Sequence, residues 1–441
     1  VLIVDALVTS PALLVADNIT QPLDVTVAAQ ILRLLRELQR DFNTAIAFVS
    51  SSLGIVSDIA DEILVLAQGR IVEQQPTSAL LDGPKHAYTS QLIRDVPRIW
   101  HDVAVSEHAP AANHGREVVL SVRDVSKTFV VSDRNRLFGS RHVQAVRGVS
   151  FEAFKGENLG IVGESSLSRL LSRIDSPDSG EILFKGKDIA RMGRGELLSL
   201  RKGFQLLLQD PFNAIPPHLT IGRTIAEPLV IHGGQGRRAV EARVRATMAE
   251  VGLSGDLYDS LPVGLSAGQR QRVNIARAMV LEPELLILDE TLSALDQVEQ
   301  AKLLDLFERI QIKHGITYIY ISHDLSMVRR VCDRVAVMYL GRIVELANNR
   351  NIFFNPAHPY TRALLSAVPT VEDKPFRVET YLLEGEPPDP VDIPPGCSFR
   401  TRCPFAFDRC ATDDPRLIPH GRDGSVACHL ADETSGHAGR S

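Results

Sequence analysis

Two short apolar runs, each leading into polar residues, stand out in the hydrophobic pattern of the chain. Leu285 to Leu288 run directly into Asp289-Glu290, and Ile319 to Ile321 precede His323. Apolar runs of this length are typical of strands in a parallel sheet that is covered on both faces. By contrast, residues 28–40 have the apolar spacing of an amphipathic helix. The pattern therefore predicts an α/β fold.

The polar residues around these runs have the chemistry of a phosphoryl-transfer site. Ligands of α/β sheets bind at the carboxyl ends of strands, and paired acids there can hold Mg²⁺ and polarise a water. Upstream, Ser266-Ala267-Gly268-Gln269 opens a predicted helix that Ser266 can cap, and such a helix start is an anion site. Each feature alone also suits a buried strand, a capped helix or a core histidine. Their order along the chain favours the functional interpretation.

The ordered set resembles the nucleotide-binding subunit of ATP-binding cassette (ABC) transporters. Ser266–Gln269 is similar to the signature loop of that family, and Asp289-Glu290 to its Mg²⁺-binding and catalytic pair. Ser293–Asp296 is similar to its D-loop, and His323 to its switch histidine. The resemblance implies a P-loop NTPase-like fold, with ATP and Mg²⁺ as ligands.

The resemblance also implies a role for each residue of the site. Glu290 would activate water, His323 would contact the γ-phosphate, and Asp289 would hold Mg²⁺. Gln209, which is followed by Asp-Pro-Phe, would be the Q-loop glutamine, a third catalytic position. The residues expected to contact ATP are Gly163, Ser165, Ser166, Phe129, Asp289, Ser266, Gly268, Gln269 and Asp296. Phe129 suits a strand core as well as it suits adenine stacking.

The phosphate-binding loop departs from the family pattern. Residues 145–165 resemble the approach to a Gly-x-x-x-x-Gly-Lys-Ser/Thr loop, whose backbone N–H groups and lysine hold the phosphates. Against that pattern about five residues are missing before Ser166, including the second glycine and the lysine. Arg169 lies inside the following predicted helix, so it is not expected to replace that lysine. In the signature, Ala267 stands where the family has glycine. We therefore expect little or no ATPase activity from this polypeptide alone.

The chain repeats itself at an offset of 272 residues. Asp17 falls on Asp289, Asp24 on Asp296 and Ser51 on His323, and residues 69–73 fall on the identical residues 341–345. A long fixed offset with shared landmarks predicts a duplicated domain.

The repeat predicts the domain organisation. Residues 1–100 are the C-terminal part of a first ABC domain, 101–117 a linker, 118–350 a near-complete second ABC domain with a helical subdomain at about 212–262, and 351–441 a Cys-rich extension. About 150 residues of the first copy are expected to lie outside the chain. The first copy has Asn18 and Ser51 at the positions of Glu290 and His323, which fits either a non-hydrolysing half or decay.

The extension resembles the C-terminal region of oligopeptide and dipeptide importer ATPases. It contains His-Pro-Tyr-Thr-Arg from His358 onward and cysteines at Cys397, Cys403, Cys410 and Cys428. Members of that group can hold a 4Fe–4S cluster on four such cysteines, and thiolates suit this ligation. Zinc is the alternative metal, and four buried thiols without metal are the third interpretation.

The composition limits the partners. The 441 residues carry a formal net charge of −6. The chain as a whole therefore lacks the excess of basic residues that is typical of nucleic-acid-binding proteins. The sequence has no run of 18 apolar residues, the length that would predict a membrane span. A membrane role would therefore be peripheral, on the cytoplasmic side. The resemblance implies transmembrane permease subunits and a substrate-binding protein as partners, and peptides as transported solute. The alternatives are a non-catalytic remnant or scaffold and a soluble cassette ATPase.

Overall fold

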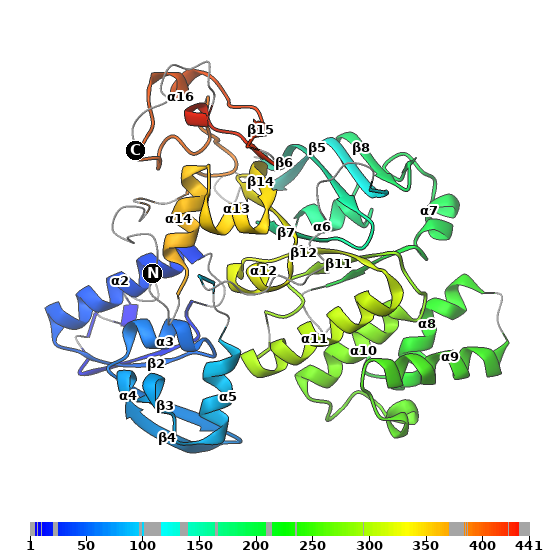
Figure 1. Cartoon of the computed structure of the whole chain (residues 1–441), viewed down its shortest axis with the longest axis horizontal. Coiled ribbons are helices and arrows are strands. Elements are labelled where there is room, and N and C mark those ends of the chain that lie inside the picture. The colour runs from blue at the N-terminus through cyan, green and yellow to red at the C-terminus, as the bar shows by residue number, and fades with distance from the viewer. Residues whose placement is uncertain are drawn as a thin grey trace.

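The computed structural model divides the chain into three parts (Figure 1). It describes residues 5–6, 8–9, 11–20, 25–96, 99–100, 116–132, 140–163, 166–208, 214–233, 236–293, 295–369, 383, 385, 387–421 and 423–431, the side chain of Ser132 excepted. We call the described residues up to 100 the N-terminal unit, those from 116 to 369 the cassette, and those from 383 onward the extension. The N-terminal unit is blue in Figure 1, and the extension is orange to red.

The N-terminal unit contains two small sheets flanked by helices. Strands β1 (Leu13–Asp17) and β2 (Ala45–Val49) pair in parallel, and β3 (Glu62–Ala67) and β4 (Arg70–Pro76) pair antiparallel. The helices are α2 (Val25–Phe42), α3 (Leu53–Ile59), α4 (Thr77–Asp82) and α5 (Ala87–Asp95).

The cassette is built on a sheet that the extension continues. Its strand order is β10 (Phe204–Leu207), β11 (Leu285–Asp289), β12 (Thr317–Ile321), β7 (Asn158–Val162), β13 (Arg334–Tyr339), β14 (Arg342–Asn348), β16 (Gly424–Val426) and β15 (Ile418–His420). The strands from β10 to β13 are parallel, and the remaining pairs are antiparallel.

Alternate residues of the central strands enter different cores, as the apolar runs predicted. Leu286 and Leu288 of β11 pack in one core with helices, whereas Leu285 and Ile287 pack in the other core with the second sheet. Such a strand is covered on both faces, which explains why its sequence is apolar throughout. All four side chains are buried.

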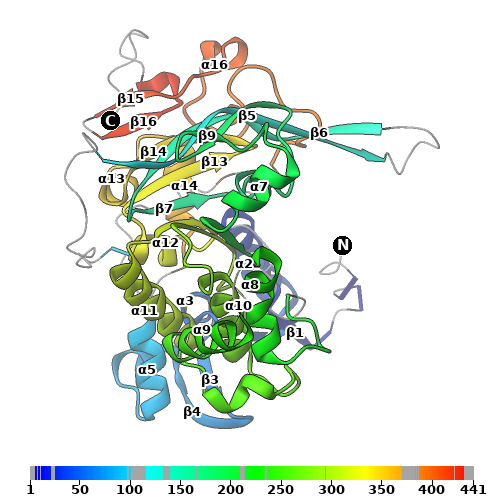
Figure 2. The same cartoon turned by 90° about the vertical axis from the view of Figure 1, so that its right-hand side faces the viewer.

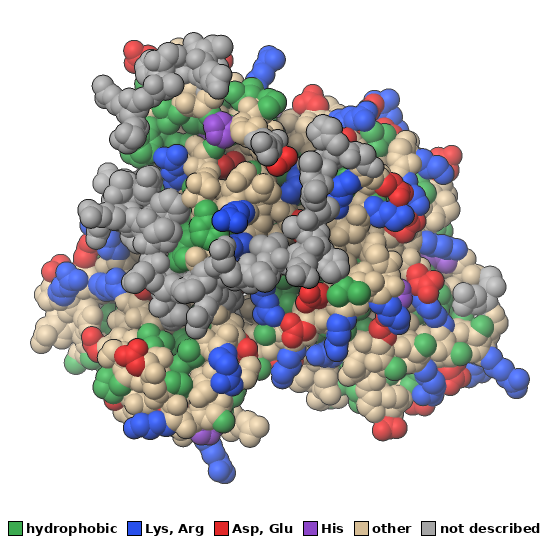
Figure 3. Space-filling model, in the orientation of Figure 1, with side chains coloured by type: hydrophobic (Ala, Val, Ile, Leu, Met, Phe, Trp, Pro, Cys, Tyr) green, Lys and Arg blue, Asp and Glu red, His purple; other side chains and the backbone are tan. Residues whose placement is uncertain are grey.

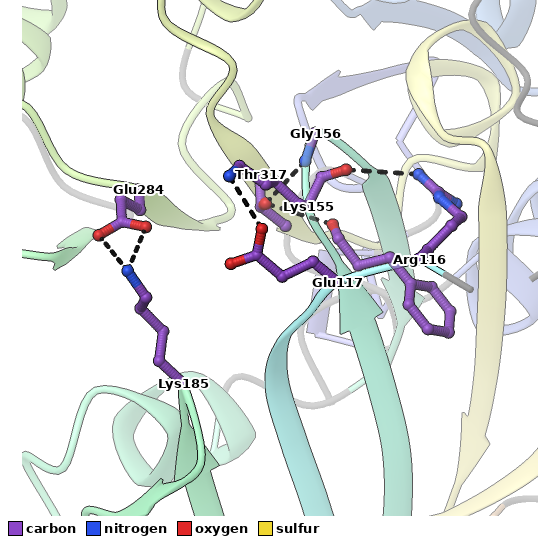
Figure 4. A network of polar contacts seen from close by, with 8 residues as sticks. Arg116, Glu117, Lys155, Gly156, Lys185, Glu284 and Thr317 are labelled. Carbon is purple, nitrogen blue, oxygen red and sulfur yellow. Dashed lines mark hydrogen bonds and ion pairs between the residues drawn. The ribbon is translucent and has the colours of Figure 1, made fainter.

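A second, antiparallel sheet lies over one face of the central sheet. Its order is β6 (Ser140–Phe154), β5 (Val118–Ser132), β8 (Ser179–Phe184) and β9 (Lys187–Asp188), followed by α7 (Arg194–Leu200). Polar contacts join the two sheets (Figure 4). Lys185, after β8, binds both carboxylate oxygens of Glu284 at 2.9 and 2.8 Å, and the Gly156 N–H donates to the Thr317 hydroxyl at 3.0 Å.

Helix α6 (Ser166–Leu171) packs between the two sheets, where its leucines share a core with β5, β6 and β8. The other helices cover the opposite face and the lower end of the cassette (Figure 2). They are α8 (Ile221–His232), α9 (Arg237–Glu250), the 3-10 helix η1 (Gly255–Asp259), α10 (Ala267–Met279), α11 (Gln297–His314), α12 (Leu325–Val331), α13 (Asn349–Phe354) and α14 (Pro359–Ala367). The extension adds α16 (Asp408–Thr412) and the 3-10 helix η2 (His429–Ala431).

The elements of the N-terminal unit recur in the cassette with the same bounds. Each described helix and strand from β1 to α5 has a counterpart of equal length 272 residues later, in the series from β11 to α14. Backbone details recur too, since Asn18 and Glu290 both have a φ of 48°. Glu73 accepts hydrogen bonds from the N–H groups of residues 85 and 86, as Glu345 does from those of residues 357 and 358.

The cassette elements that precede β11 have no described counterpart, and β7 is one of them. Strand β7 lies between β12 and β13 and joins them into one sheet. Among the described residues of the N-terminal unit no strand lies between β2 and β3, and the unit has two separate sheets. The second sheet and α6, which share a core with Leu285 and Ile287, likewise have no described counterpart. Leu13 and Val15 of β1 are 57 % and 63 % exposed, whereas Leu285 and Ile287 are buried.

The two units contact each other reciprocally. Helix α5 of the N-terminal unit packs on α11, and α14 of the cassette packs on α2. Because α5 corresponds to α14 and α2 to α11, this is the pattern of an isologous interface. The segment after α5 enters the cassette core, where the fully buried Ile99 offers its carbonyl to Arg329 at 3.2 Å.

The α/β fold and the predicted helices and strands are confirmed. The helix expected at 28–40 lies within α2, the apolar runs 285–288 and 319–321 lie within β11 and β12, and the helix expected after Ser266 is α10. Of the predicted linker, 101–115 lies outside the described residues. The domain boundaries stay predictions.

Candidate nucleotide-hydrolysis site

The acid pair lies at the carboxyl end of β11, as predicted. Asp289 is the last residue of the strand and is 5 % exposed. Glu290 follows with a left-handed backbone, which carries its side chain out of the strand direction. The two carboxylates therefore leave the sheet in different directions from adjacent positions. This arrangement would allow one of them to bind a metal ion and the other to act as a base.

Glu290 and His323 come together from neighbouring strands. His323 follows β12, which pairs with β11, and its Nε2 lies 3.3 Å from Oε1 of Glu290. Burial raises the pKa of Glu290, and the nearby His323 opposes that rise. A carboxylate with a raised pKa beside an imidazole is a stronger proton acceptor than an exposed glutamate.

Both residues line a cavity of about 240 Å³ between the two units. Its cassette wall also includes Ser322 and Asp324, and its other wall includes Thr20, Ser52 and Ile55 of the N-terminal unit. The N-terminal unit thus faces the acid–histidine pair directly, a placement that the sequence did not predict.

The sequence reasoning missed one polar partner of the acid pair. The hydroxyl of Ser168 donates to Oδ2 of Asp289 at 2.6 Å, and the serine is fully buried. Ser168 is the third residue of α6. One carboxylate oxygen of the expected Mg²⁺ ligand is therefore engaged by the protein itself.

Replacing Ser168 by alanine should destabilise the fold by about 2 kcal/mol, because the buried Asp289 loses a charge-assisted hydrogen bond. Ser172→Ala is a matched control, since its hydroxyl donates at 2.9 Å to the uncharged Ser168 carbonyl. That control should cost about 1 kcal/mol. Urea unfolding followed by circular dichroism measures both values, and equal losses would contradict the special role of the Asp289 contact.

The segment between β7 and α6 is short. Gly163 follows β7, α6 begins at Ser166, and the two residues between them lie outside the described part. A Cβ on Gly163 would lie 2.7 Å from Cβ of Met338, so the backbone passes close to β13. Arg169, on α6, pairs with Asp175 at 2.7 Å. This ion pair agrees with the expectation that Arg169 does not replace the lysine.

The signature-like residues form a complete helix cap. Ser266 accepts the Gln269 N–H at 3.2 Å, and the Gln269 side chain accepts the Ser266 N–H at 3.0 Å. A Cβ on Gly268 would lie 2.6 Å from Oε2 of Glu299, in the first turn of α11. Asp296 caps α11 by accepting the Glu299 N–H at 2.9 Å. The capping box satisfies backbone donors of α10, and the Glu299 carboxylate beside it disfavours an anion.

Gln209 and Ser165 lie outside the described residues. Phe129 lies on β5, and its ring centroid is 5.6 Å from Nζ of Lys127. This is a cation–π contact. The role of Phe129 in adenine binding stays a prediction.

The four cysteines of the extension gather around one small cavity. Cys397, Cys403, Cys410 and Cys428 all line a space of about 10 Å³, and none forms a disulfide. Burial raises the pKa of Cys403 to about 12 and that of Cys428 to about 11, so these thiols are neutral at pH 7. Within the described part of the chain, no group of three or more His, Cys, Asp or Glu side chains is placed to hold a metal ion.

The parallel sheet, the acid pair and the facing histidine define an ATP-binding cassette. In agreement, a model described as ABC transporter matches residues 146–293. A second model, described as oligopeptide/dipeptide transporter C-terminal region, matches twice, at residues 72–115 and 344–410. The chain belongs to the ATP-binding proteins of ABC transporters that carry this C-terminal region.

Curated relatives extend across most of the chain. It is 38 % identical over 418 residues to the glutathione import ATP-binding protein GsiA of Shigella boydii, covering 89 % of this chain and 67 % of that protein. It is 39 % identical over 417 residues to GsiA of Salmonella typhi, covering 89 % and 66 %. The chain thus spans about two thirds of the length of these relatives.

Two solved structures are also similar. One is cbiO1 from Clostridium perfringens, described as part of the ABC transporter complex cbiONQ, with a TM-score of 0.47, 26 % identity, and coverage of 56 % of this chain and 95 % of that one. The other is the dimeric bacterial ABC transporter cassette MJ0796, with a TM-score of 0.46, 22 % identity, and coverage of 52 % and 99 %. In the described part of the chain, no helix has the length and apolar character needed to cross a membrane.

Proposed function

We propose that this chain is the energy-coupling, ATP-binding subunit of an ABC importer for peptides or similar small solutes. The observation that carries the proposal is the Asp289-Glu290 pair at the end of β11 with His323 beside it. The relatives named for glutathione import support a peptide-like solute. The partners would be permease subunits and a substrate-binding protein, and the chain would be peripheral on the cytoplasmic side of the membrane.

In this proposal each residue of the site acts as its position allows. Asp289 would hold Mg²⁺, which would neutralise phosphate charge, and Glu290 would orient and deprotonate the attacking water. His323, 3.3 Å from Glu290, would donate to phosphate while keeping that carboxylate oriented. Figure 3 shows Lys and Arg side chains interspersed with Asp and Glu over the coloured parts of one face of the molecule.

We further propose that the N-terminal unit and the cassette are two copies of one ABC domain. The equal element bounds at an offset of 272 residues support this, as do the two matches to the same C-terminal region. The first copy would be catalytically silent, because Asn18 and Ser51 occupy the positions of Glu290 and His323. An amide cannot accept the proton of water, and a serine hydroxyl does not reach as far as an imidazole.

A non-catalytic scaffold is the second candidate function, and one short segment and two contacts favour it. The link between β7 and α6 is short, Ser168 engages Asp289, and Asp175 engages Arg169. These features predict weak ATP binding and impaired hydrolysis in a chain that still folds and still docks on permease subunits.

The cysteine cluster would be a metal site in either case. Its four thiols line one cavity, and metal binding would have to displace their protons at a cost that the raised pKa values increase. We propose a 4Fe–4S cluster, with zinc as the alternative. Metal analysis and visible absorption of protein purified without oxygen test for the cluster and for zinc. A metal-free, colourless, folded protein would show that the four cysteines are buried thiols without a metal.

Reconstitution tests the transport proposal against the scaffold. The chain and its Glu290→Gln variant are purified with candidate permease subunits and placed in proteoliposomes with a loaded binding protein. Solute-stimulated ATP hydrolysis that Glu290→Gln abolishes supports a catalytic subunit. Co-purification without hydrolysis in either sample supports the scaffold, and failure to co-purify contradicts both.

A further inference from the structure

The segment after α5 contacts the helix that directly follows His323. Helix α12 begins at Leu325, two residues after His323, and its fifth residue is Arg329. Arg329 is 2 % exposed, and its Nε donates to the carbonyl of the fully buried Ile99 at 3.2 Å. One short helix therefore connects the contact at Ile99 with the histidine that lies beside Glu290.

The Arg329 guanidinium is part of a network that also binds the end of α12. Its Nη1 donates to Oδ1 of Asn349 at 2.6 Å, and its central carbon lies 5.6 and 5.1 Å from the ring centroids of Phe353 and Phe354. Nδ2 of Asn349 in turn donates to three backbone carbonyls at the C-terminal end of α12, those of residues 328, 329 and 332. The Ile99 carbonyl thus takes part in the contacts that hold this helix end.

A buried charge requires acceptors for its donors, and this requirement couples the segment to α12. A guanidinium that loses an acceptor inside an apolar core keeps its desolvation cost without the compensating hydrogen bond. If the segment left, Arg329 would have to turn toward water, and Asn349 would lose the partner of its Oδ1. The position of α12 therefore depends on whether the segment is docked.

The other end of α12 is joined closely to His323. Asp324 caps the helix by accepting two N–H groups of its first turn, at 2.9 and 3.1 Å, and its own N–H donates to the Ser322 hydroxyl at 3.0 Å. His323 lies between these two bonded residues, and its Nε2 is 3.3 Å from Oε1 of Glu290. A shift of α12 would therefore change the distance between the histidine and the carboxylate.

The N-terminal unit has serine at both ends of the corresponding helix. Ser51 and Ser57 stand 272 residues before His323 and Arg329. The Ser57 hydroxyl donates to the Gly54 carbonyl at 2.9 Å, within α3 itself. The arginine thus occurs in the unit that has the histidine, as expected if its role is to position that histidine.

We propose that the segment after α5 positions His323 through Arg329, so that docking of the segment sets the distance between His323 and Glu290. Arg329 is then a positioning residue, because it acts on the site through α12. The inference rests on the function proposed above for the Glu290–His323 pair. It gives the connection between the two units a role in the hydrolysis step.

NMR spectroscopy of the full chain with carbon-13-labelled histidine, at one fixed and mildly alkaline pH, tests the proposal. His323→Asn identifies the ring resonance of His323. We expect Arg329→Met and Ile99→Ala each to move this resonance by more than its line width, and Arg329→Lys, which keeps a donor, to move it less. Arg330→Met is the matched control, because Arg330 is the next residue of α12 and pairs instead with Asp305 at 2.8 Å.

Hydrogen exchange followed by mass spectrometry shows whether the segment is released in the same samples. The amides around Ile99 should exchange at least about tenfold faster in Arg329→Met and Ile99→Ala, because buried packing is lost locally. The double variant should move the His323 resonance no further than either single change, since both break one connection. Ile310→Ala, in the same core on α11, controls for a general loss of packing and should leave the resonance in place.

Three outcomes in folded variants would overturn the proposal: a released segment with an unmoved His323 resonance, additive shifts in the double variant, or an equal shift in either control. If Arg329→Met does not fold, Ile99→Ala and Arg329→Lys decide the question in the same way. None of these readouts needs nucleotide. An unmoved resonance in a chain that hydrolyses ATP with its partners therefore refutes this inference alone, and a coupled shift in a chain without hydrolysis refutes only the proposed function.

Discussion

Inserting Gly-Ser-Gly-Lys-Ser between Ser165 and Ser166 is expected to raise the affinity of the chain for Mg-ATP by about 100-fold or more. The insertion restores the Gly-x-x-x-x-Gly-Lys-Ser pattern from Gly163 onward. The gain has two sources, since a longer loop can turn several backbone N–H groups toward the phosphates and the lysine adds a charge-assisted contact. Both β7 and α6, which would flank the loop, are already present.

Titration with a fluorescent ATP analogue measures the change. The same insertion with methionine in place of lysine is the control, and it should recover only the part of the affinity that the backbone amides provide. Tight binding by the unmodified chain, equal to that of the inserted one, would show that the short segment already holds triphosphate. In that case the expectation of impaired nucleotide binding would be wrong.

Acid should destabilise the protein through His358. This residue caps α14, where Nδ1 accepts the Tyr360 N–H at 3.0 Å, and burial lowers its pKa to about 3 from the ordinary 6.5. Between these two pH values the unfolded chain binds a proton that the folded chain does not. Stability is therefore complete above pH 6.5 and falls as the pH decreases, by about 2 kcal/mol at pH 5 and about 4 kcal/mol at pH 3.5.

Urea unfolding of the wild type and of His358→Asn over this pH range checks the prediction. Asparagine can still cap the helix but does not titrate, so the variant should lose a small amount of stability at pH 7.5 and show a flatter pH dependence. His86, the exposed counterpart of His358, gives a matched control, and His86→Asn should retain the wild-type slope. Parallel curves for the wild type and His358→Asn would contradict the assignment.

Much of the cassette could be predicted because its sequence constraints are local. Leu285–Leu288 and Ile319–Ile321 are apolar on both faces, which only a covered central strand requires, and the polar residues after them had to meet at one edge of the sheet. The meeting of Glu290 with His323 follows from that edge alone. The repeat could also be predicted from the sequence, because identical residues such as Gly69 and Gly341 lie at the same turn in the two copies.

Other contacts of the site could not be predicted because they depend on tertiary placement. Ser168 reaches Asp289 because α6 packs beside β11, and in the sequence it is one more small residue of a helix. The cavity shared by Glu290 and the N-terminal unit depends on how α5 and α14 pack on the opposite units.

The anchoring of the segment after α5 also gives the molecule an internal optical reporter. Trp100 is the sole tryptophan of the sequence, and it packs against the cassette core beside Ile99, whose carbonyl Arg329 holds. Indole emission shifts to longer wavelength when water replaces apolar neighbours. The colour of the intrinsic fluorescence should therefore distinguish a chain whose halves stay together from one whose halves have come apart, without any label.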